Sequence, residues 1–309
     1  MRGTHCLVTG GAGFIGSHLA VELVRRGAEV TVLDNLSTGQ RSYVPEDAMF
    51  LRGDVCEADT VATAVRDQEY VFHLAAEVGN VLSVENPLQN MEVNVGGAIR
   101  VFEAARRAGA ARVVYASSSA CLGEARRVPQ GEDHPCVPIS PYGASKYAAE
   151  RYGLAFHAVH GLPFVATRFF NVYGPRQGST EYGNVIPIFF RRVRDGQPLR
   201  IFGDGRQTRD FTYVADVVQA LILAAERANA VGQVFHIGTG RATSVLRLAR
   251  TMQGVMGRAT GSYHDPARKG EVRRSVADIR KARRLLGFVP KVDLESGLRS
   301  TLASFAPHS

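Results

Sequence analysis

Lysine is nearly absent from this chain of 309 residues, in which four lysines accompany 33 arginines. Lys146 is the only lysine in the first 268 residues. Arginine is a flat fork that stays charged, whereas lysine is a compact ammonium on a flexible stem. Because the sequence otherwise uses arginine, Lys146 is a candidate for a chemical role that arginine does not fill.

Other absences narrow the class of protein. No apolar run approaches the roughly 20 residues of a membrane span, and the N-terminal residues lead directly into a strand pattern rather than a signal peptide. The four cysteines are scattered, with neither CxxC nor metal-site spacing. These features predict a cytoplasmic protein with reduced thiols, no membrane contact and no bound metal.

The charge balance is basic, with a formal net charge of +8, and such a balance attracts nucleic acid or small polyphosphates. The sequence has no tryptophan, no long basic tail and no nucleic-acid-binding motif. Its densest basic run, residues 268–284, also contains acidic residues. An anionic small molecule is therefore favoured over nucleic acid, and a general bias toward arginine is the alternative explanation.

Strand and helix patterns alternate through the first half of the chain. Strand patterns occupy residues 5–9, 29–34, 49–53, 70–74, 112–117 and 164–168, and helical spacing occupies 14–27, 57–66, 91–107 and 142–160. Strands joined through helices pair in parallel with right-handed crossovers. The pattern predicts an α/β fold with a doubly wound parallel sheet.

The second half has shorter elements separated by Gly, Pro and Arg. Helical patterns cover residues 185–194, 214–227 and 244–257, and strand patterns cover 199–202 and 234–237. There is no repeat and no low-complexity linker. We therefore expect a first domain over residues 1–171 and a smaller α/β region over 172–309, partly interleaved with the first.

A glycine-rich turn follows the first strand and opens the first helix. Gly10, Gly13 and Gly16 let the backbone approach a pyrophosphate. The first helical residues, Phe14 and Ile15, supply free N–H groups at the positive end of the helix dipole. The context of strand, turn and helix predicts a dinucleotide site, with a purely structural glycine turn as the alternative.

The ends of the following strands extend this site. Asp34 ends the second strand eighteen residues after Gly16, where an acid binds the adenosine ribose and repels a 2′-phosphate, so NAD is favoured over NADP. Asp54-Val55 follow the third strand and could meet the adenine edge, although an Asp there also caps a helix. Leu74-Ala75-Ala76 end the fourth strand with small residues, which let a cofactor pass closely or simply pack tightly.

Tyr142 and Lys146 stand four residues apart in a predicted helix and therefore share one of its faces. A nearby ammonium favours the phenolate, so Lys146 is expected to lower the pKa of Tyr142 from about 10. The phenol would then be a general base near neutral pH. The spacing alone is a weak pattern, and a surface Tyr and Lys on one helix face is the alternative.

These motifs together resemble the extended short-chain dehydrogenase/reductase family, in particular its NAD-dependent nucleotide-sugar epimerases and dehydratases. The resemblance runs from Thr9 to about Pro290. It comprises, in the family's order, the glycine turn, Asp34-Asn35, Asp54-Val55, His73-Leu74-Ala75-Ala76, Asn94, Ser117-Ser118-Ser119, Tyr142 to Lys146 and Arg168 to Pro175. It implies that residues 1–171 form a Rossmann domain that binds NAD and carries the catalytic residues, and that residues 172–309 bind a nucleotide sugar.

The resemblance also implies a role for each catalytic residue. Tyr142 takes a proton from a sugar hydroxyl as its carbon yields hydride to NAD. Lys146 lowers the pKa of Tyr142 and holds the nicotinamide ribose, and Ser119 hydrogen-bonds the same sugar oxygen. Asn35 and Asn94 match further cofactor-binding positions. A serine that satisfies loop backbone is the alternative role for Ser119.

On the substrate side, the resemblance implies a diphosphate site. Asn171, Arg209 and Arg268 match residues that bind the diphosphate, and two arginines on one diphosphate make charge-assisted, bidentate hydrogen bonds. Either arginine alone is equally explained as a solvated surface residue. Asn184-Val185 begin a helix whose free N–H groups can meet a phosphate. A uridine or thymidine diphosphate sugar is the expected substrate class.

Two further positions bear on the nucleotide and the sugar. Glu271 stands where relatives usually have an Asp that binds the nucleotide ribose. Ser275 matches a gatekeeper near the sugar C2 group, seven residues beyond Arg268. A small gatekeeper leaves room for an N-acetyl group, so we expect both UDP-glucose/UDP-galactose and their N-acetyl forms to be accepted.

The loop after Ser119 distinguishes the family's reactions. Dehydratases carry Asp-Glu there, because eliminating water needs an acid and a base, and decarboxylases commonly keep the Glu. Here the matching residues are Ala120 and Cys121, and Glu124 is displaced along the loop. The sequence therefore favours a 4-epimerase that works through a 4-keto sugar. Leu122 replaces a tyrosine that relatives often carry, and this could alter specificity.

Other functions stay open. A UDP-uronic acid 4-epimerase, or a UDP- or dTDP-sugar dehydratase with an unfamiliar acid, would use the same fold. A regulatory protein that binds NAD without catalysis is disfavoured, because the catalytic Ser, Tyr and Lys positions are all filled. Relatives pair through the helices corresponding to residues 90–107 and 142–160, so a homodimer is expected.

Overall fold

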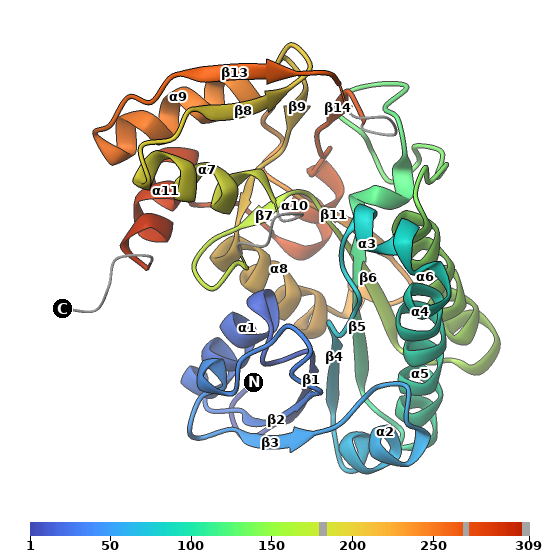
Figure 1. Ribbon diagram of the computed structural model, residues 1–309. Helices are drawn as coiled ribbons and strands as arrows, with labels where there is room; N and C mark the ends of the chain where they lie inside the picture. Colours follow the sequence, from blue (N-terminus) through green and yellow to red (C-terminus); the bar gives the residue numbers. More distant parts are fainter. Residues whose placement is uncertain (179–183, 268–271, 305–309) are drawn as a thin grey trace.

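A seven-stranded parallel sheet forms the centre of the protein, whose computed structural model describes residues 1–178, 184–267 and 272–304 (Figure 1). The strand order is β11-β6-β5-β4-β1-β2-β3. The strands are β1 (His5–Thr9), β2 (Glu29–Asp34), β3 (Met49–Arg52), β4 (Tyr70–His73), β5 (Arg112–Ser118), β6 (Phe164–Phe169) and β11 (Val234–Ile237). The predicted doubly wound α/β fold is confirmed.

Helices cover both faces of this sheet (Figure 1). One face packs against α1 (Phe14–Arg25), α8 (Val214–Glu226) and α10 (Arg280–Leu286), and the other against α2 (Ala58–Val65), α5 (Ala98–Arg107) and α6 (Pro141–His160). Each face has its own hydrophobic cluster. Strands that are buried on both sides have continuous apolar sequences. This is why their positions could be predicted well from the sequence.

The long helix predicted over residues 91–107 starts earlier than expected. It begins as α4 (Pro87–Met91), where Pro87 suits the first helical position. It then continues through a π-helical segment (Glu92–Gly97) into α5. Gly97 lets the segment lie close to Val55, because a Cβ there would be 2.8 Å from Val55 Cγ2. The short helix α3 (Asn80–Glu85) precedes it and was not predicted.

A third hydrophobic cluster lies in the C-terminal half, between α7 (Val185–Arg194), α9 (Val245–Met256) and α11 (Leu294–Ala303). Three small sheets surround it. They pair β8 (Leu199–Phe202) with β13 (Ser262–Asp265), β7 (Val172–Tyr173) with β10 (Thr212–Tyr213), and β9 (Thr208–Arg209) with both β12 (Thr243–Ser244) and β14 (Arg274–Ser275). Strand β11 and helices α8 and α10 also come from this half, yet they belong to the central sheet and its cover.

Short 3₁₀ turns complete the described chain at Arg41–Tyr43, Ser119–Leu122 and Ala228–Ala230. All four cysteines are free thiols. Among the described residues, no helix is long and apolar enough to cross a membrane.

Candidate functional site

The glycine turn between β1 and α1 is shaped so that side chains would not fit. Gly10 has a φ of +70°, and a Cβ on it would lie 2.7 Å from the backbone nitrogen of Ala75. A Cβ on Gly16 would lie 2.1 Å from the Gly10 carbonyl oxygen. Gly13 is the extended N-cap of α1, so the N–H groups of Phe14 and Ile15 open the helix without a side-chain cap. Such a turn leaves a helix N-terminus for an anion.

Asp34, at the end of β2, fixes this turn from the side. Its carboxylate accepts hydrogen bonds from the N–H groups of Ala12 (2.9 Å) and Leu36 (2.8 Å). The side chain is only 8% exposed. The carboxylate therefore lies beside the glycine turn, as the prediction of a ribose-binding acid requires.

Asp54 and Asn35 meet at the neighbouring strand ends. The Asn35 amide donates to Asp54 at 2.8 Å, and Asp54 accepts the Cys56 N–H at 2.9 Å. Partial burial acts to raise the pKa of Asp54, but hydrogen bonds from Cys56 and Asn35 outweigh it and lower that pKa. Val55 is buried in the sheet's hydrophobic cluster, so Asp54 is the polar group of this pair.

The chain after β4 runs directly against the glycine turn. Leu74 and Ala75 donate their N–H groups to the carbonyl and the hydroxyl of Thr9, at 3.1 and 3.2 Å. The absent side chain of Gly10 makes room for Ala75. The segment Leu74-Ala75-Ala76 thus lies against the glycine turn, and its contact with a cofactor stays a prediction.

Asn94, predicted to bind cofactor, is 1% exposed and holds the next residues of the chain after β4. Its amide accepts the Glu77 N–H at 2.9 Å and donates to the Glu77 carbonyl at 3.0 Å. It also donates to the Ser145 hydroxyl, at 3.0 Å, on α6. The structure therefore gives Asn94 a supporting position between the chain after β4 and helix α6.

Taken together, the turn, its helix N-terminus and Asp34 fit a dinucleotide. The cradle is one that a Cβ on Gly10 or Gly16 would fill, and the acid at the β2 end suits a ribose that carries no 2′-phosphate.

Helix α6 carries the predicted base and the isolated lysine. Ser140 caps the helix by accepting the Gly143 N–H at 3.1 Å, and Pro141 occupies its first turn. Lys146 is only 3% exposed, and its Nζ lies 4.4 Å from the centre of the Tyr115 ring. The ammonium is thus held by a cation–π contact with a buried ring rather than by a carboxylate.

The pKa values in this pair differ from the prediction. Burial raises the pKa of Tyr142 to about 12, against a hydrogen bond with Ser118 that acts to lower it. Burial likewise lowers the pKa of Lys146 to about 8, while Cys121 and Glu150 act to raise it. The expectation that Lys146 brings the pKa of Tyr142 below 10 is wrong for this arrangement. The reason is that desolvation of the phenolate dominates.

The serine that influences Tyr142 is Ser118, a residue to which the sequence assigned no separate role. Strand β5 ends at Ser118, whose hydroxyl accepts the Ala120 N–H at 3.1 Å and caps the 3₁₀ turn that starts at Ser119. The same hydroxyl lies close enough to Tyr142 to act against the rise in the pKa of its phenol. Ser119 is half-buried, and its hydroxyl has no hydrogen bond to the described residues. The run of three serines was the only signal, and the catalytic role of Ser119 stays a prediction.

The residues that follow Ser119 contribute no carboxylate near Tyr142. Cys121 is fully buried, with its Sγ 3.6 Å from the Ser117 hydroxyl. Burial raises the pKa of this thiol to about 11, so it stays protonated. Glu124 accepts the backbone N–H of Arg273 at 2.8 Å, which anchors the loop to the C-terminal half.

Leu122 stands where relatives often have tyrosine. It is 1% exposed and belongs to a small hydrophobic cluster with Phe170, Ala277 and Ile279. The side chain of Leu122 is therefore part of the hydrophobic core at this position.

The structure brings three predicted substrate residues together. Asn171, Asn184 and Val185 line one small cavity, together with Gln177 and Phe211. Asn184 is the extended N-cap of α7, with no side-chain cap, so the first N–H groups of the helix stay open toward a phosphate.

Arg209 and Ser275 lie side by side on the three-stranded sheet. Strands β9 and β14 are parallel, and the Cα of Ser275 is paired with that of Arg209. Arg209 donates to the Thr208 carbonyl at 2.9 Å. Ser275 is 7% exposed. Arg268 and Glu271, the other two predicted residues, lie outside the described residues.

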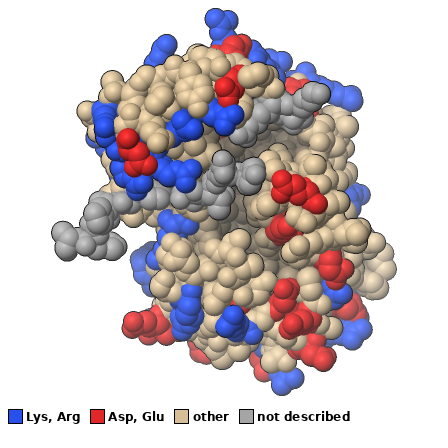
Figure 2. All heavy atoms as spheres, viewed as in Figure 1, with Lys and Arg blue, Asp and Glu red and all other residues tan. Residues whose placement is uncertain are grey.

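Charge is unevenly divided between the two halves of the chain. Residues 172–309 contain 22 basic and 11 acidic residues, whereas residues 1–171 contain 15 and 18. Figure 2 shows basic side chains over the C-terminal region and most of the acidic ones over the rest of the visible face, with a hollow between them. A positive C-terminal region favours the approach of an anionic ligand.

Comparison with known proteins agrees with this geometry. The model of the NAD dependent epimerase/dehydratase family matches residues 6–238. A UDP-glucose 4-epimerase from Mycolicibacterium smegmatis is 39% identical over 306 residues, 97% of each chain. The structure of a UDP-glucose 4-epimerase with UDP-glucose from Thermotoga maritima is similar with a TM-score of 0.94, 38% identity and 98% coverage of each chain. A UDP-N-acetylglucosamine 4-epimerase from Methanobrevibacter ruminantium has a TM-score of 0.94, 35% identity and 99% coverage of each chain.

Relatives with other activities are nearly as similar. A UDP-N-acetyl-alpha-D-glucosaminuronate decarboxylase from Bacillus cytotoxicus is 34% identical, with 97% of each chain covered. A dTDP-glucose 4,6-dehydratase from Actinoplanes is 35% identical, with 96% of each chain covered. Relatives of this chain at similar identity thus carry different names for their reactions. The chain is a member of the NAD dependent epimerase/dehydratase family.

Proposed function

We propose that the protein is an NAD-dependent 4-epimerase of UDP-sugars, acting on UDP-glucose and UDP-galactose through a 4-keto intermediate. The observation that carries the proposal is the residue set around Tyr142. A phenol, an ammonium and serine hydroxyls are present, while the two positions that follow Ser119 are Ala120 and a buried, protonated Cys121. Such a set supports hydroxyl oxidation and reduction but supplies no acid–base pair for eliminating water.

The chain's own residues have separate tasks in this reaction. Gly10, Gly16 and Asp34 would hold NAD, which would supply a reversible hydride acceptor for the sugar C4. Tyr142 takes the proton from the C4 hydroxyl and gives it back after the keto sugar has turned over. Ser118, and by family resemblance Ser119, orient the phenol and the sugar oxygen.

Lys146 is the group whose charge changes most easily in this site. With a pKa of about 8, it is mainly an ammonium at neutral pH and loses its charge in mild alkali. Its predicted role that remains is to hold the nicotinamide ribose. This task uses the ammonium form, so we expect activity to decline above about pH 8.

The diphosphate would lie between Asn171, the N-terminus of α7 and Arg209. The cavity lined by Asn171, Asn184 and Val185 supports this, as does the excess of positive charge in the C-terminal half. Ser275 is small and paired with Arg209, and by the family resemblance it would leave room at the sugar C2 position. We therefore propose that N-acetylated UDP-sugars are also substrates.

A homodimer is proposed from the surface of α3, α4 and α6. These helices expose large apolar side chains, which are costly to leave in water when they gather on one surface. The exposed residues are Val84, Leu88, Met91, Tyr152 and Val159. A second copy of the chain is the expected partner, and its presence would be measured by sedimentation of the purified protein.

The test uses purified protein with UDP-glucose, UDP-galactose and the two N-acetyl sugars, without added reductant. Chromatography that separates C4 epimers should show each pair reaching the same ratio from both sides, and Tyr142→Phe should abolish this. Accumulation of a 4-keto-6-deoxy sugar would instead identify a dehydratase. Turnover of UDP-uronic acids alone would identify the alternative epimerase or a decarboxylase.

A further inference from the structure

A buried ion pair lies directly behind the catalytic residues. Glu150 is fully buried on α6, and Arg168 on β6 is 4% exposed. Two nitrogens of Arg168 donate to the two oxygens of Glu150, at 2.6 and 2.9 Å. Removing one partner of such a pair leaves an uncompensated charge, so the two side chains hold each other in a fixed geometry.

The Glu150 carboxylate connects three segments that carry predicted site residues. On its own helix, Lys146 is four residues away on the same face. Through the Ser117 hydroxyl, which donates to it at 2.7 Å, Glu150 holds the end of β5 directly before Ser118. Through Arg168 it holds β6, three residues before Asn171. One carboxylate thus sets the spacing between the base, its serine and the substrate side.

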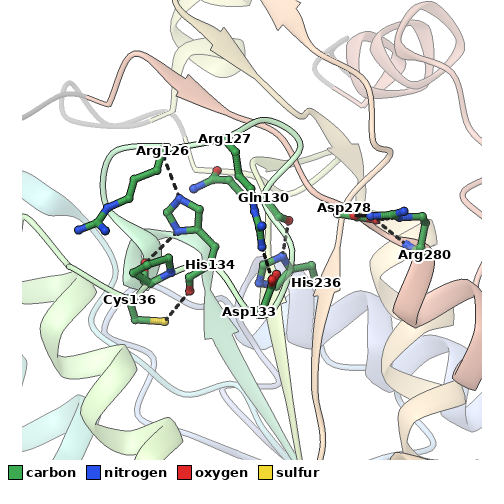
Figure 3. A network of polar contacts seen from close by, with 10 residues as sticks. Arg126, Arg127, Gln130, Asp133, His134, Cys136, His236, Asp278 and Arg280 are labelled. Carbon is green, nitrogen blue, oxygen red and sulfur yellow. Dashed lines mark hydrogen bonds and ion pairs between the residues drawn. The ribbon is translucent and has the colours of Figure 1, made fainter.

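The far side of Arg168 is closed by a neutral histidine, His236, whose contact with Gln130 is drawn in Figure 3. His236 Nδ1 lies 2.9 Å from the Gln130 carbonyl, which can only accept, so Nδ1 carries the proton. Nε2 is then an acceptor and faces Arg168 Nη1 at 3.4 Å. Burial lowers the pKa of His236 to about 3, so the ring brings no charge. Glu150 is therefore the only carboxylate that neutralises Arg168 within this network of the described chain.

We propose that Glu150 is a positioning residue for the reaction, which holds Ser117, and through it Ser118, in register with Tyr142 and Lys146. It is fully buried and acts through Ser117, Arg168 and its own helix. The expected loss of kcat rests on the proposed function. The expected change in the titration of Lys146 does not.

Glu150→Gln is the first test, with Glu103→Gln as the matched control. Glu103 lies on α5, is solvent-accessible, and pairs with Arg106 and Arg107. We expect Glu150→Gln to lower kcat at least roughly tenfold with little change in KM, because the base and its serine lose their relative placement. The alkaline limit of the pH profile should also move to lower pH, because Glu150 helps to keep Lys146 charged. Glu103→Gln should change neither.

Ser117→Ala is the second test, and it keeps the proposal falsifiable if Glu150→Gln fails to fold. It removes one hydrogen bond without unpairing Arg168. We expect kcat to fall several-fold with the pH profile unmoved. Thr301→Val is its control, since Thr301 is a buried hydroxyl that donates to the Gly297 carbonyl at the distant helix α11.

A readout without substrate separates the two proposals. With only four lysines, protein labelled with ¹³C at lysine Cε gives few NMR signals, and Lys146→Arg assigns the one that belongs to Lys146. Its titration should move to lower pH in Glu150→Gln and stay in place in Ser117→Ala. An unmoved Lys146 titration in Glu150→Gln, or wild-type kcat in Ser117→Ala, would overturn the positioning role. Wild-type protein that epimerises no sugar would refute only the proposed function.

Discussion

Gly16→Ala is the sharpest test of the cofactor cradle. The new Cβ would lie 2.1 Å from the Gly10 carbonyl oxygen, about 1.3 Å closer than an ordinary van der Waals contact. That oxygen cannot retreat freely, because it accepts the Gly13 N–H at 3.1 Å while the Gly10 N–H is bound to the Leu33 carbonyl at 2.8 Å. The obstruction is backbone rather than a flexible side chain, so the turn itself must open.

The opening has a cost that can be bounded. Overpacking a well-packed site costs about 1–3 kcal/mol, and alanine in a helix recovers up to about 1 kcal/mol relative to glycine. We expect Gly16→Ala to be less stable by about 1–2 kcal/mol and to bind NAD more than tenfold more weakly, because the N–H groups of the turn are displaced.

Gly254→Ala supplies the matched control, since a Cβ at this exposed position in α9 meets nothing within 4 Å. It should be more stable than wild type by about 0.5–1 kcal/mol and should bind NAD normally. Chemical denaturation gives the stabilities, and calorimetric titration gives the affinity for NAD. Wild-type NAD affinity in Gly16→Ala would refute the close approach of the turn as the basis of the cradle.

Three further predictions address the rest of the site. Tyr142→Phe should lower kcat by about 10²–10⁴-fold in the epimer assay while NAD binding stays intact, and retained turnover would point to another base. Arg209→Ala should raise KM for UDP-sugars about 10–100-fold, because this factor corresponds to the loss of one charged hydrogen bond. Arg206 is exposed in the preceding turn, so Arg206→Ala should leave KM unchanged. Equal effects of the two substitutions would contradict a specific contact of Arg209. His73 and His236 are buried and have pKa values lowered to about 3, so the unfolded chain binds their protons first as pH falls below about 6.5. Stability should then decrease from pH 6.5 downward, by about 2 kcal/mol per histidine at pH 5, and a flat denaturation midpoint between pH 7 and 5 would exclude this.

The elements that sequence predicted well are those whose signal is local. Strands β1, β2, β8 and β11 and helix α7 have the predicted bounds, because a buried strand or an amphipathic helix has a residue pattern that is visible over a few residues. The glycine turn was found for the same reason. The two-residue strands β7, β10, β12 and β14 were not predicted, since they exist only through pairing with distant partners.

Features of the site that depend on direction and burial escaped prediction. Three serines are adjacent in the sequence, and the end of β5 and the direction of the 3₁₀ turn decide which of them faces Tyr142. Ser118 caps that turn. The pKa of Tyr142 depends on how deeply the phenol lies. A nearby ammonium was visible in the sequence, but the desolvation that outweighs it was not. The Glu150–Arg168 pair likewise joins residues from two elements that sequence spacing does not relate.

Lysine is scarce in this chain. Substitution of Lys146 tests whether that position needs a lysine rather than an arginine. The ammonium lies over the Tyr115 ring in a site that is 3% exposed, and burial brings its pKa to about 8. A guanidinium there would be bulkier and would stay charged at every working pH. Lys146→Arg should therefore lose at least about 100-fold in kcat by displacing Tyr142, and its pH profile should lack the alkaline decline.

Lys281→Arg is the matched control, because Lys281 is also a partly buried lysine, with its Nζ 5.2 Å from the Phe235 ring. Burial lowers its pKa too, yet it is not among the residues assigned to the site, and we expect nearly wild-type activity. Steady-state kinetics from pH 6 to 10 would compare the two variants. If both variants keep wild-type activity, arginine can replace Lys146, and the lysine at this position has no special chemical role. If only Lys146→Arg fails, the one lysine before residue 269 is retained for chemistry.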